Sequence, residues 1–149
     1  MPKLSLLALV ALAAACTPMG PGPVITPPAA PMAMAAGFPE GSYTVTLAAS
    51  DVPAGAPDDM RTSLVGNWVI AFGHDGHAMV SVNGRQVVDA PYSVSGNELI
   101  LTDDTGEYAC HSNARYTWHS TSTELHLSRV EDACDGRAVA LTAHPLVRR

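Results

Sequence analysis

From residue 38 onward, apolar and polar residues alternate with a period of two along short stretches of the chain. Such alternation is typical of β-strands that bury one face. The clearest stretches put two sets of residues on an inward face: Trp68, Ile70 and Phe72, then Ala78, Val80 and Val82. Further inward pairs follow with the same period: Tyr92 with Val94, Leu99 with Leu101, and Leu125 with Leu127. The pattern predicts a series of amphipathic strands.

Turn-forming residues separate these stretches. Asp-Gly, Asn-Gly, Ser-Gly-Asn and Asp-Asp-Thr-Gly occur at residues 75–76, 83–84, 95–97 and 103–106. Short strands joined by such turns are typical of antiparallel hairpins. Two more strands are expected at residues 42–48 and 138–142. We therefore predict an all-β domain over residues 38–149, a small antiparallel up-and-down β-barrel of about eight strands.

One short helix is expected over residues 57–64, because Pro-Asp-Asp suits its beginning and a glycine follows its end. A short helix leading into Gly66-Asn67-Trp68 resembles the entry to the first strand of the lipocalin-like, or calycin, barrels. That resemblance implies a barrel-closing pair in which Trp68 packs against an arginine late in the last strand. Arg148 is the nearest match, and Arg137 is the alternative. A second interpretation makes Trp68 an ordinary core residue.

The first fifteen residues have the layout of a signal peptide, with Lys3 preceding an apolar run that is broken only by a serine. The run is shorter than the roughly 20 residues that cross a bilayer as a helix. It ends in Leu-Ala-Ala-Ala-Cys, which resembles the bacterial lipobox. The resemblance implies that residues 1–15 are removed and that Cys16 carries acyl chains such as palmitate. The alternative is an ordinary secretory signal cut after the three alanines, an A-x-A site.

Residues 16–37 are rich in proline, alanine and methionine and contain no charged residue. Such composition favours extended conformers, so the segment is predicted to be a semi-rigid tether. Without the signal peptide, seven arginines stand against fourteen acidic residues, a formal net charge of −7. We expect no binding to nucleic acid and no electrostatic adhesion to anionic lipid. The lipid anchor is the expected membrane contact, on a cell membrane or outer membrane, facing the periplasm or the exterior.

The remaining two cysteines are Cys110 and Cys134. They are predicted to form a disulfide, because an exported chain matures in an oxidising compartment. The competing hypothesis makes Cys110 a nucleophile assisted by the adjacent His111. It is disfavoured, because adjacent residues of a strand point to opposite faces.

Two histidine pairs are candidate metal ligands. His74 and His77 share one turn, and His119 and His126 are expected to lie near each other across a hairpin, on its outer face. Neither pair supplies the three or four ligands that zinc sites use, so we expect no metal and no other cofactor. The paired carboxylates lie beside turns, and the familiar catalytic motifs do not occur. We therefore expect a protein that is not an enzyme.

The inward aromatic residues suggest binding instead. The candidate pocket residues are Trp68, Phe72, Tyr92, Tyr108, Tyr116 and Trp118. A barrel of about eight strands either holds one small ligand or is filled by side chains. The first hypothesis is a tethered barrel that binds a small apolar molecule. The alternative is an envelope structural or interaction module with a filled core, protease-inhibitor-like, that binds an envelope protein partner. A cavity larger than about 300 Å³ would favour the first.

Overall fold

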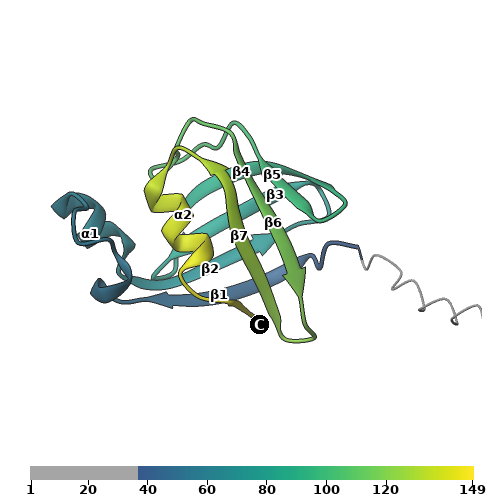
Figure 1. Cartoon of the computed structure of the whole chain (residues 1–149), viewed down its shortest axis with the longest axis horizontal. Coiled ribbons are helices and arrows are strands. Elements are labelled where there is room, and N and C mark those ends of the chain that lie inside the picture. The colour runs from purple at the N-terminus through teal and green to yellow at the C-terminus, as the bar shows by residue number, and fades with distance from the viewer. Residues whose placement is uncertain (1–36) are drawn as a thin grey trace, which may run out of the picture. The chain divides into compact units, whose positions relative to one another are not determined.

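The computed structural model describes residues 37–149, which form a closed antiparallel barrel of eight strands (Figure 1). The predicted all-β barrel is confirmed, and each strand pairs with its neighbours in the sequence. The strands are β1 (Gly41–Leu47), β2 (Gly66–Phe72), β3 (His77–Val82), β4 (Arg85–Ser95), β5 (Glu98–Leu101), β6 (Ala114–Ser120), β7 (Glu124–Asp132) and β8 (Leu146–Arg148). The helices are the 3₁₀ turn η1 (Ala49–Asp51), α1 (Asp58–Leu64) and α2 (Asp135–Thr142). Within the described residues, no helix has the length and apolar character needed to cross a membrane.

The hairpins form where the turn residues predicted them. Between β3 and β4, Asn83 and Gly84 have φ angles of 50° and 83°. Positive φ at both central residues is the geometry that asparagine and glycine tolerate and that matches the twist of the flanking strands. The expected strand at residues 42–48 and the expected helix at residues 57–64 are also confirmed, as β1 and α1. Local sequence chemistry therefore accounts for most of the barrel.

The strand predicted at residues 138–142 is wrong, because this stretch lies in the helix α2. Ala138 and Ala140 are buried, which looks like strand alternation, but the adjacent Leu141 is buried as well. Burial of neighbouring residues fits the 3.6-residue period of a helix, and alanine and leucine are strong helix formers. The last strand is β8, which follows α2 and has three residues.

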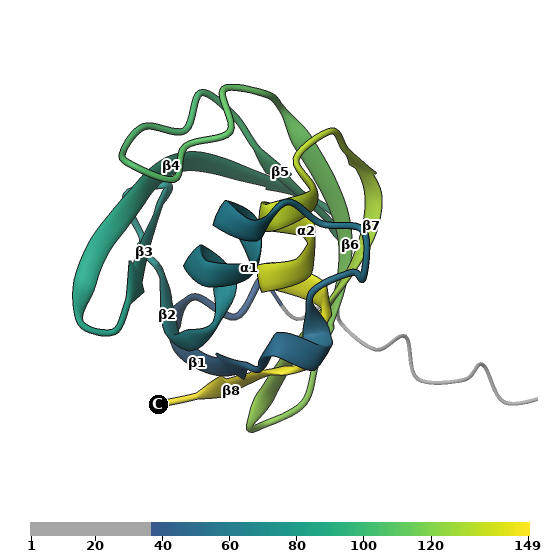
Figure 2. The same ribbon diagram turned by 90° about the vertical axis from the view of Figure 1, so that its left-hand side faces the viewer.

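The barrel is closed by few backbone pairs. The short strand β8 pairs with β1 through Tyr43–Arg148 and Thr44–Val147, and with β7 through Glu124–Val147 and Leu125–Leu146. Looking along the barrel, α1 and α2 lie across one open end (Figure 2). The helices therefore cap one end of the barrel, whereas β8 closes its wall between β1 and β7.

A long connection between β5 and β6 lies against β4. Thr105 and Asp89 exchange two backbone hydrogen bonds of 2.8 and 2.9 Å. Gly106 has a φ of 115°, and a Cβ there would lie 2.3 Å from the carbonyl oxygen of Val87. Only glycine permits this close approach of the two backbones. The connection is thus held against β4 by these hydrogen bonds and this close backbone contact.

The barrel interior is filled unevenly. Most of the large, fully buried apolar side chains come from β1 and from β5 to β8, whereas β2 and β4 contribute one each: Tyr43, Leu47, Leu99, Tyr116, Leu125 and Leu146, with Ile70 and Val87. The wall made by β3 and β4 instead contributes Ala78 and Ala90, which are directly paired across the strands. The predicted inward position of Val94 is wrong: the residue is exposed, because it lies beside the β4–β5 turn at the end of the hairpin. Small paired residues leave unfilled space beside them.

Candidate ligand-binding site

A cavity of about 540 Å³ lies beside this small-residue wall, between the inner faces of β2, β3 and β4 and the helices α1 and α2. Its volume falls within the range of about 300–1,000 Å³ that is usual for small-molecule sites. Most of its lining is aliphatic or aromatic, with Met60 and Leu64 from α1, Ile70 from β2, and Ala140 and Leu141 from α2. The cavity therefore suits an apolar molecule.

The predicted aromatic residues divide into two groups. Trp68, Phe72 and Tyr108 line the cavity, whereas Tyr92, Tyr116 and Trp118 do not. Phe72 also contacts a second aromatic cluster that contains Tyr92 and Trp118, whereas Tyr116 belongs to neither group.

The second cluster is centred on Phe38, which precedes β1. The Phe38 ring packs edge-on against Phe72 and Trp118, with ring centres 5.0 and 5.3 Å apart. The hydroxyl of Tyr92 lies 2.8 Å from the Gly73 carbonyl oxygen and 3.1 Å from the Glu40 carboxylate, two acceptors that share its single proton. Burial, and then the Glu40 carboxylate, raises the pKa of Tyr92 to about 12. These residues fill their end of the barrel rather than leaving space for a ligand.

Trp68 holds α1 against the cavity. Its indole nitrogen donates a 2.7 Å hydrogen bond to the carbonyl oxygen of Leu64, the last residue of α1. The proposed pairing of Trp68 with Arg148 is not what the structure shows. The guanidinium of Arg148 lies 5.1 Å from the ring centre of Tyr43 and donates to its hydroxyl at 2.8 Å. The reason is topological, because β1 lies between β8 and β2 and presents Tyr43 to the arginine.

The alternative partner, Arg137 of α2, is committed to a buried polar cluster that forms part of the cavity wall. Its Nε and Nη2 donate to the two carboxylate oxygens of Asp132 at 2.8 and 2.7 Å. Its Nη1 donates to Asp104 at 3.1 Å, and Nη2 also donates to the Ser112 carbonyl oxygen at 2.8 Å. The hydroxyl of Tyr116 donates to Asp132. We call Asp104, Tyr116, Asp132 and Arg137 the arginine cluster.

The arginine cluster is shielded from solvent, with 1% of Asp104 and 9% of the Arg137 side chain exposed. Burial on its own raises the pKa of Asp132, but hydrogen bonds from Arg137, Tyr116 and the Cys134 backbone outweigh it and lower the pKa below 3.8. Burial, and then Asp132, raises the pKa of the Tyr116 hydroxyl. Asp132 is therefore a carboxylate that accepts hydrogen bonds from all its neighbours.

The disulfide predicted between Cys110 and Cys134 is confirmed, with Cα atoms 5.9 Å apart. It joins the β5–β6 connection to the residue before α2, and both cysteines line the cavity. The backbone N–H groups of Cys110 and His111 donate to Asp104, each at 2.9 Å. Cys110 is therefore held in a disulfide bond, and the backbone N–H of His111 donates a hydrogen bond to Asp104 of the arginine cluster.

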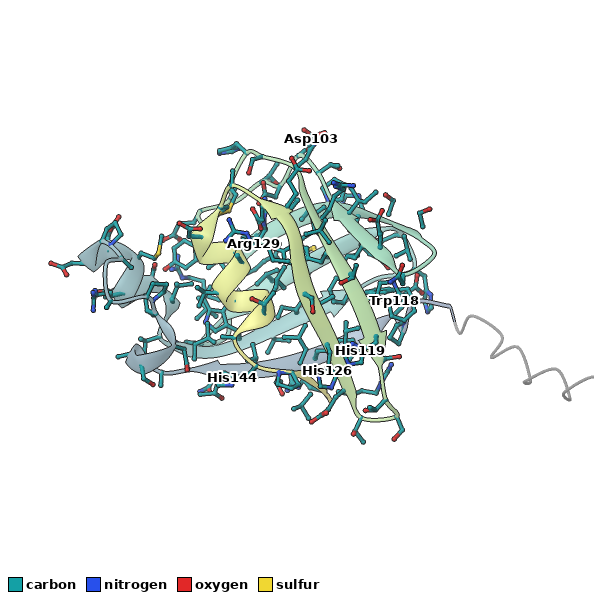
Figure 3. The ribbon with its side chains drawn as sticks, viewed as in Figure 1. Asp103, Trp118, His119, His126, Arg129 and His144 are labelled. Carbon is teal, nitrogen blue, oxygen red and sulfur yellow. A yellow bond between two sulfur atoms is a disulfide. The ribbon has the colours of Figure 1, made fainter. Side chains whose placement is uncertain are left out.

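The two histidine pairs lie away from the cavity lining. As predicted, His119 and His126 are directly paired across the β6–β7 hairpin, and their rings stack with centres 4.4 Å apart (Figure 3). His77 contacts Asp89 at 2.7 Å, and His74 contacts Glu40. Within residues 37–149, no group of three or more His, Cys, Asp or Glu side chains is arranged to hold a metal ion.

The arginine cluster was not identified by the sequence. The lipocalin-like resemblance offers Arg137 only as a partner for Trp68, and its acidic partners Asp104 and Asp132 lie beside predicted turns. The one signal in the sequence is that Arg137 directly precedes four apolar residues, 138–141, of which the structure buries three.

No family model, curated protein or solved structure matches this chain.

Proposed function

We propose that this chain is an extracytoplasmic lipoprotein, tethered to a membrane through acylated Cys16, whose barrel binds one small apolar molecule. The observation that carries the ligand part is the cavity of about 540 Å³ between the barrel wall and the two α-helices. Its size and its lining by Trp68, Phe72 and Tyr108 fit this function. The tether and its lipid rest on the sequence of residues 1–37, of which residues 1–36 lie outside the described residues.

One further observation supports the ligand-binding proposal over its alternative, and a second supports the location outside the cytoplasm. A filled interaction module would offer an exposed apolar patch in place of a cavity. Among the described residues, the exposed large apolar side chains are four valines, one between α1 and β2 and the others on three different strands: Val65, Val94, Val130 and Val147. The disulfide also suits an oxidising compartment outside the cytoplasm.

Native mass spectrometry of the full-length chain, purified from a bacterial host, tests the ligand part. We expect a co-purifying small molecule that Ala90→Leu displaces, because the larger side chain fills the cavity beside Ala78. The matched control is Val94→Leu, an exposed position on the same strand, which should retain the molecule. A wild-type chain that is empty in repeated preparations contradicts the ligand proposal.

Intact-mass analysis of the same chain tests the anchor. The mature chain should begin at Cys16 and carry the mass of acyl groups, and it should be recovered with membranes. Cys16→Ala should abolish both the added mass and the membrane recovery. A mature N-terminus at another residue, or an unmodified Cys16, contradicts the lipoprotein proposal.

A further inference from the structure

The polar groups of the cavity lining are not evenly charged. Three carboxylates are present: Asp59 on α1, Asp104 in the β5–β6 connection and Asp135 at the start of α2. Arg137 is the one cationic side chain that lines the cavity. Because the remaining lining is largely apolar, these few groups decide which polar end of a ligand is accepted there.

Arg137 is not available to an anionic ligand. Its three nitrogens already donate to two carboxylates and to the Ser112 carbonyl oxygen, at distances of 2.7 to 3.1 Å. Two aspartates, Asp104 and Asp132, share this one guanidinium. Counted as two carboxylates and one guanidinium, the arginine cluster has a formal charge of −1 beside the cavity.

The other two carboxylates lie on the helices that cap the barrel. Asp135 is contacted by Arg129 at 3.2 Å, in an ion pair exposed to solvent. Asp59 is exposed, and no ion pair to it is found among residues 37–149. A ligand carboxylate would thus lose its hydration and be repelled by the lining carboxylates. A neutral end would lose less hydration free energy, and a cationic end would be attracted by the carboxylates.

We infer that the cavity selects its ligand by charge, accepting an apolar molecule whose polar end is neutral or cationic and excluding fatty acids and other carboxylates. This inference rests on the proposed ligand-binding function. It goes further by naming the chemical class of the ligand, an alcohol-like or amine-like amphiphile.

Three probes with the same ten-carbon chain test it: decanol, decylamine and decanoate. The full-length chain in vesicles of zwitterionic lipid carries Trp118→Phe, so that the cavity residue Trp68 is the only tryptophan in the sample. Binding is followed by Trp68 fluorescence at neutral pH and about 0.15 M salt, where the screening length is about 8 Å. Ala90→Leu in the same background gives the signal that arises from the lipid alone. We expect decanol and decylammonium to bind, and decanoate to bind at least tenfold more weakly than decylammonium.

Asp59→Asn assigns the effect to the cavity, with Asp58→Asn as the matched control. Both residues belong to the first turn of α1, but only Asp59 lines the cavity. The ratio of decylammonium to decanoate affinity should fall by about two- to fivefold in Asp59→Asn, the range of one exposed charge pair. It should not change in Asp58→Asn.

The outcomes separate the two proposals. If none of the probes binds, the ligand-binding function fails, and the charge selection fails with it. If decanol binds while decanoate binds as tightly as decylammonium, the function stands and the charge selection is overturned. Equal ratios in the two asparagine variants would also overturn the assignment to Asp59.

Discussion

Replacing Arg137 with methionine tests the arginine cluster. Methionine keeps much of the volume of the side chain but removes the charge that Asp104 and Asp132 share. Two carboxylates would remain buried, with 1% and 4% of the two residues exposed. Breaking a buried ion pair by removing one partner costs about 3–5 kcal/mol. Domains of this size are stable by only about 5–15 kcal/mol, so Arg137→Met should lose a large part of the free energy of unfolding.

The loss should depend on pH in a defined direction. In the wild-type chain, the lowered pKa of Asp132 contributes stability that is present above 3.8 and is lost as the pH falls below that value. In Arg137→Met, the hydrogen bonds from Arg137 no longer offset the burial that raises the pKa of Asp132, so protonation of this carboxylate relieves part of the cost as the pH falls. The difference in free energy of unfolding between wild type and Arg137→Met, measured by urea unfolding, should therefore be smaller at pH 4 than at pH 7.

The matched control is Arg115→Met. Arg115 is exposed on β6 and contacts Glu131 at 3.2 Å, a surface ion pair of the kind worth less than about 1 kcal/mol. A loss for Arg137→Met as small as that of the control would refute the argument. An equal loss at pH 7 and pH 4 would show that packing, and not charge, stabilises this region.

Three other measurements test the structure. Replacing Cys110 and Cys134 with serine should cost about 3–4 kcal/mol, because the bond closes a loop of roughly 25 residues; thermal unfolding with no shift would contradict this. Trp68→Ala should cost about 3–5 kcal/mol in urea unfolding, because it removes a buried side chain and the hydrogen bond to α1; full stability would be inconsistent with its place in the core. His77 has a pKa raised above 6.5 by its hydrogen bond to Asp89, so it contributes stability below that pH and loses it as the pH rises through the raised pKa. The stability difference between wild type and His77→Gln should be larger at pH 5.5 than at pH 8.5, and an equal difference would contradict the contact.

The barrel could be predicted because its strands and turns are determined by residues close together in the sequence. Trp68, Ile70 and Phe72 alternate with less buried residues, and glycine at the turns sets where the hairpins reverse. The helix α2 was not predictable from alternation. Ala138 and Ala140 carry the same two-residue spacing as a strand, and only the tertiary environment buries Leu141 beside them.

The cavity and its charged wall depend on pairings that local sequence does not encode. Ala78 lies opposite Ala90 in a register that includes a bulge between Val80 and Ser81. Alternation predicts that such residues face inward, but not that two small ones meet. Arg137 and Asp104 are 33 residues apart and are brought together by the barrel and the disulfide-linked connection. The sequence therefore shows every residue of the site but does not show which charged residues lie together in it.

The short strand β8 also sets the order in which the barrel can assemble. Tyr43 pairs with Arg148, 105 positions later in the chain, and the seam between β1 and β7 passes through the three residues of β8. Hairpins such as β2–β3 and β6–β7 need only neighbouring residues, but the ring cannot close until residues 146–148 are present. Contacts of such long sequence separation are slow to form, because the chain between them must first be ordered. The barrel therefore remains an open sheet until residues 146–148 are available to pair with both β1 and β7.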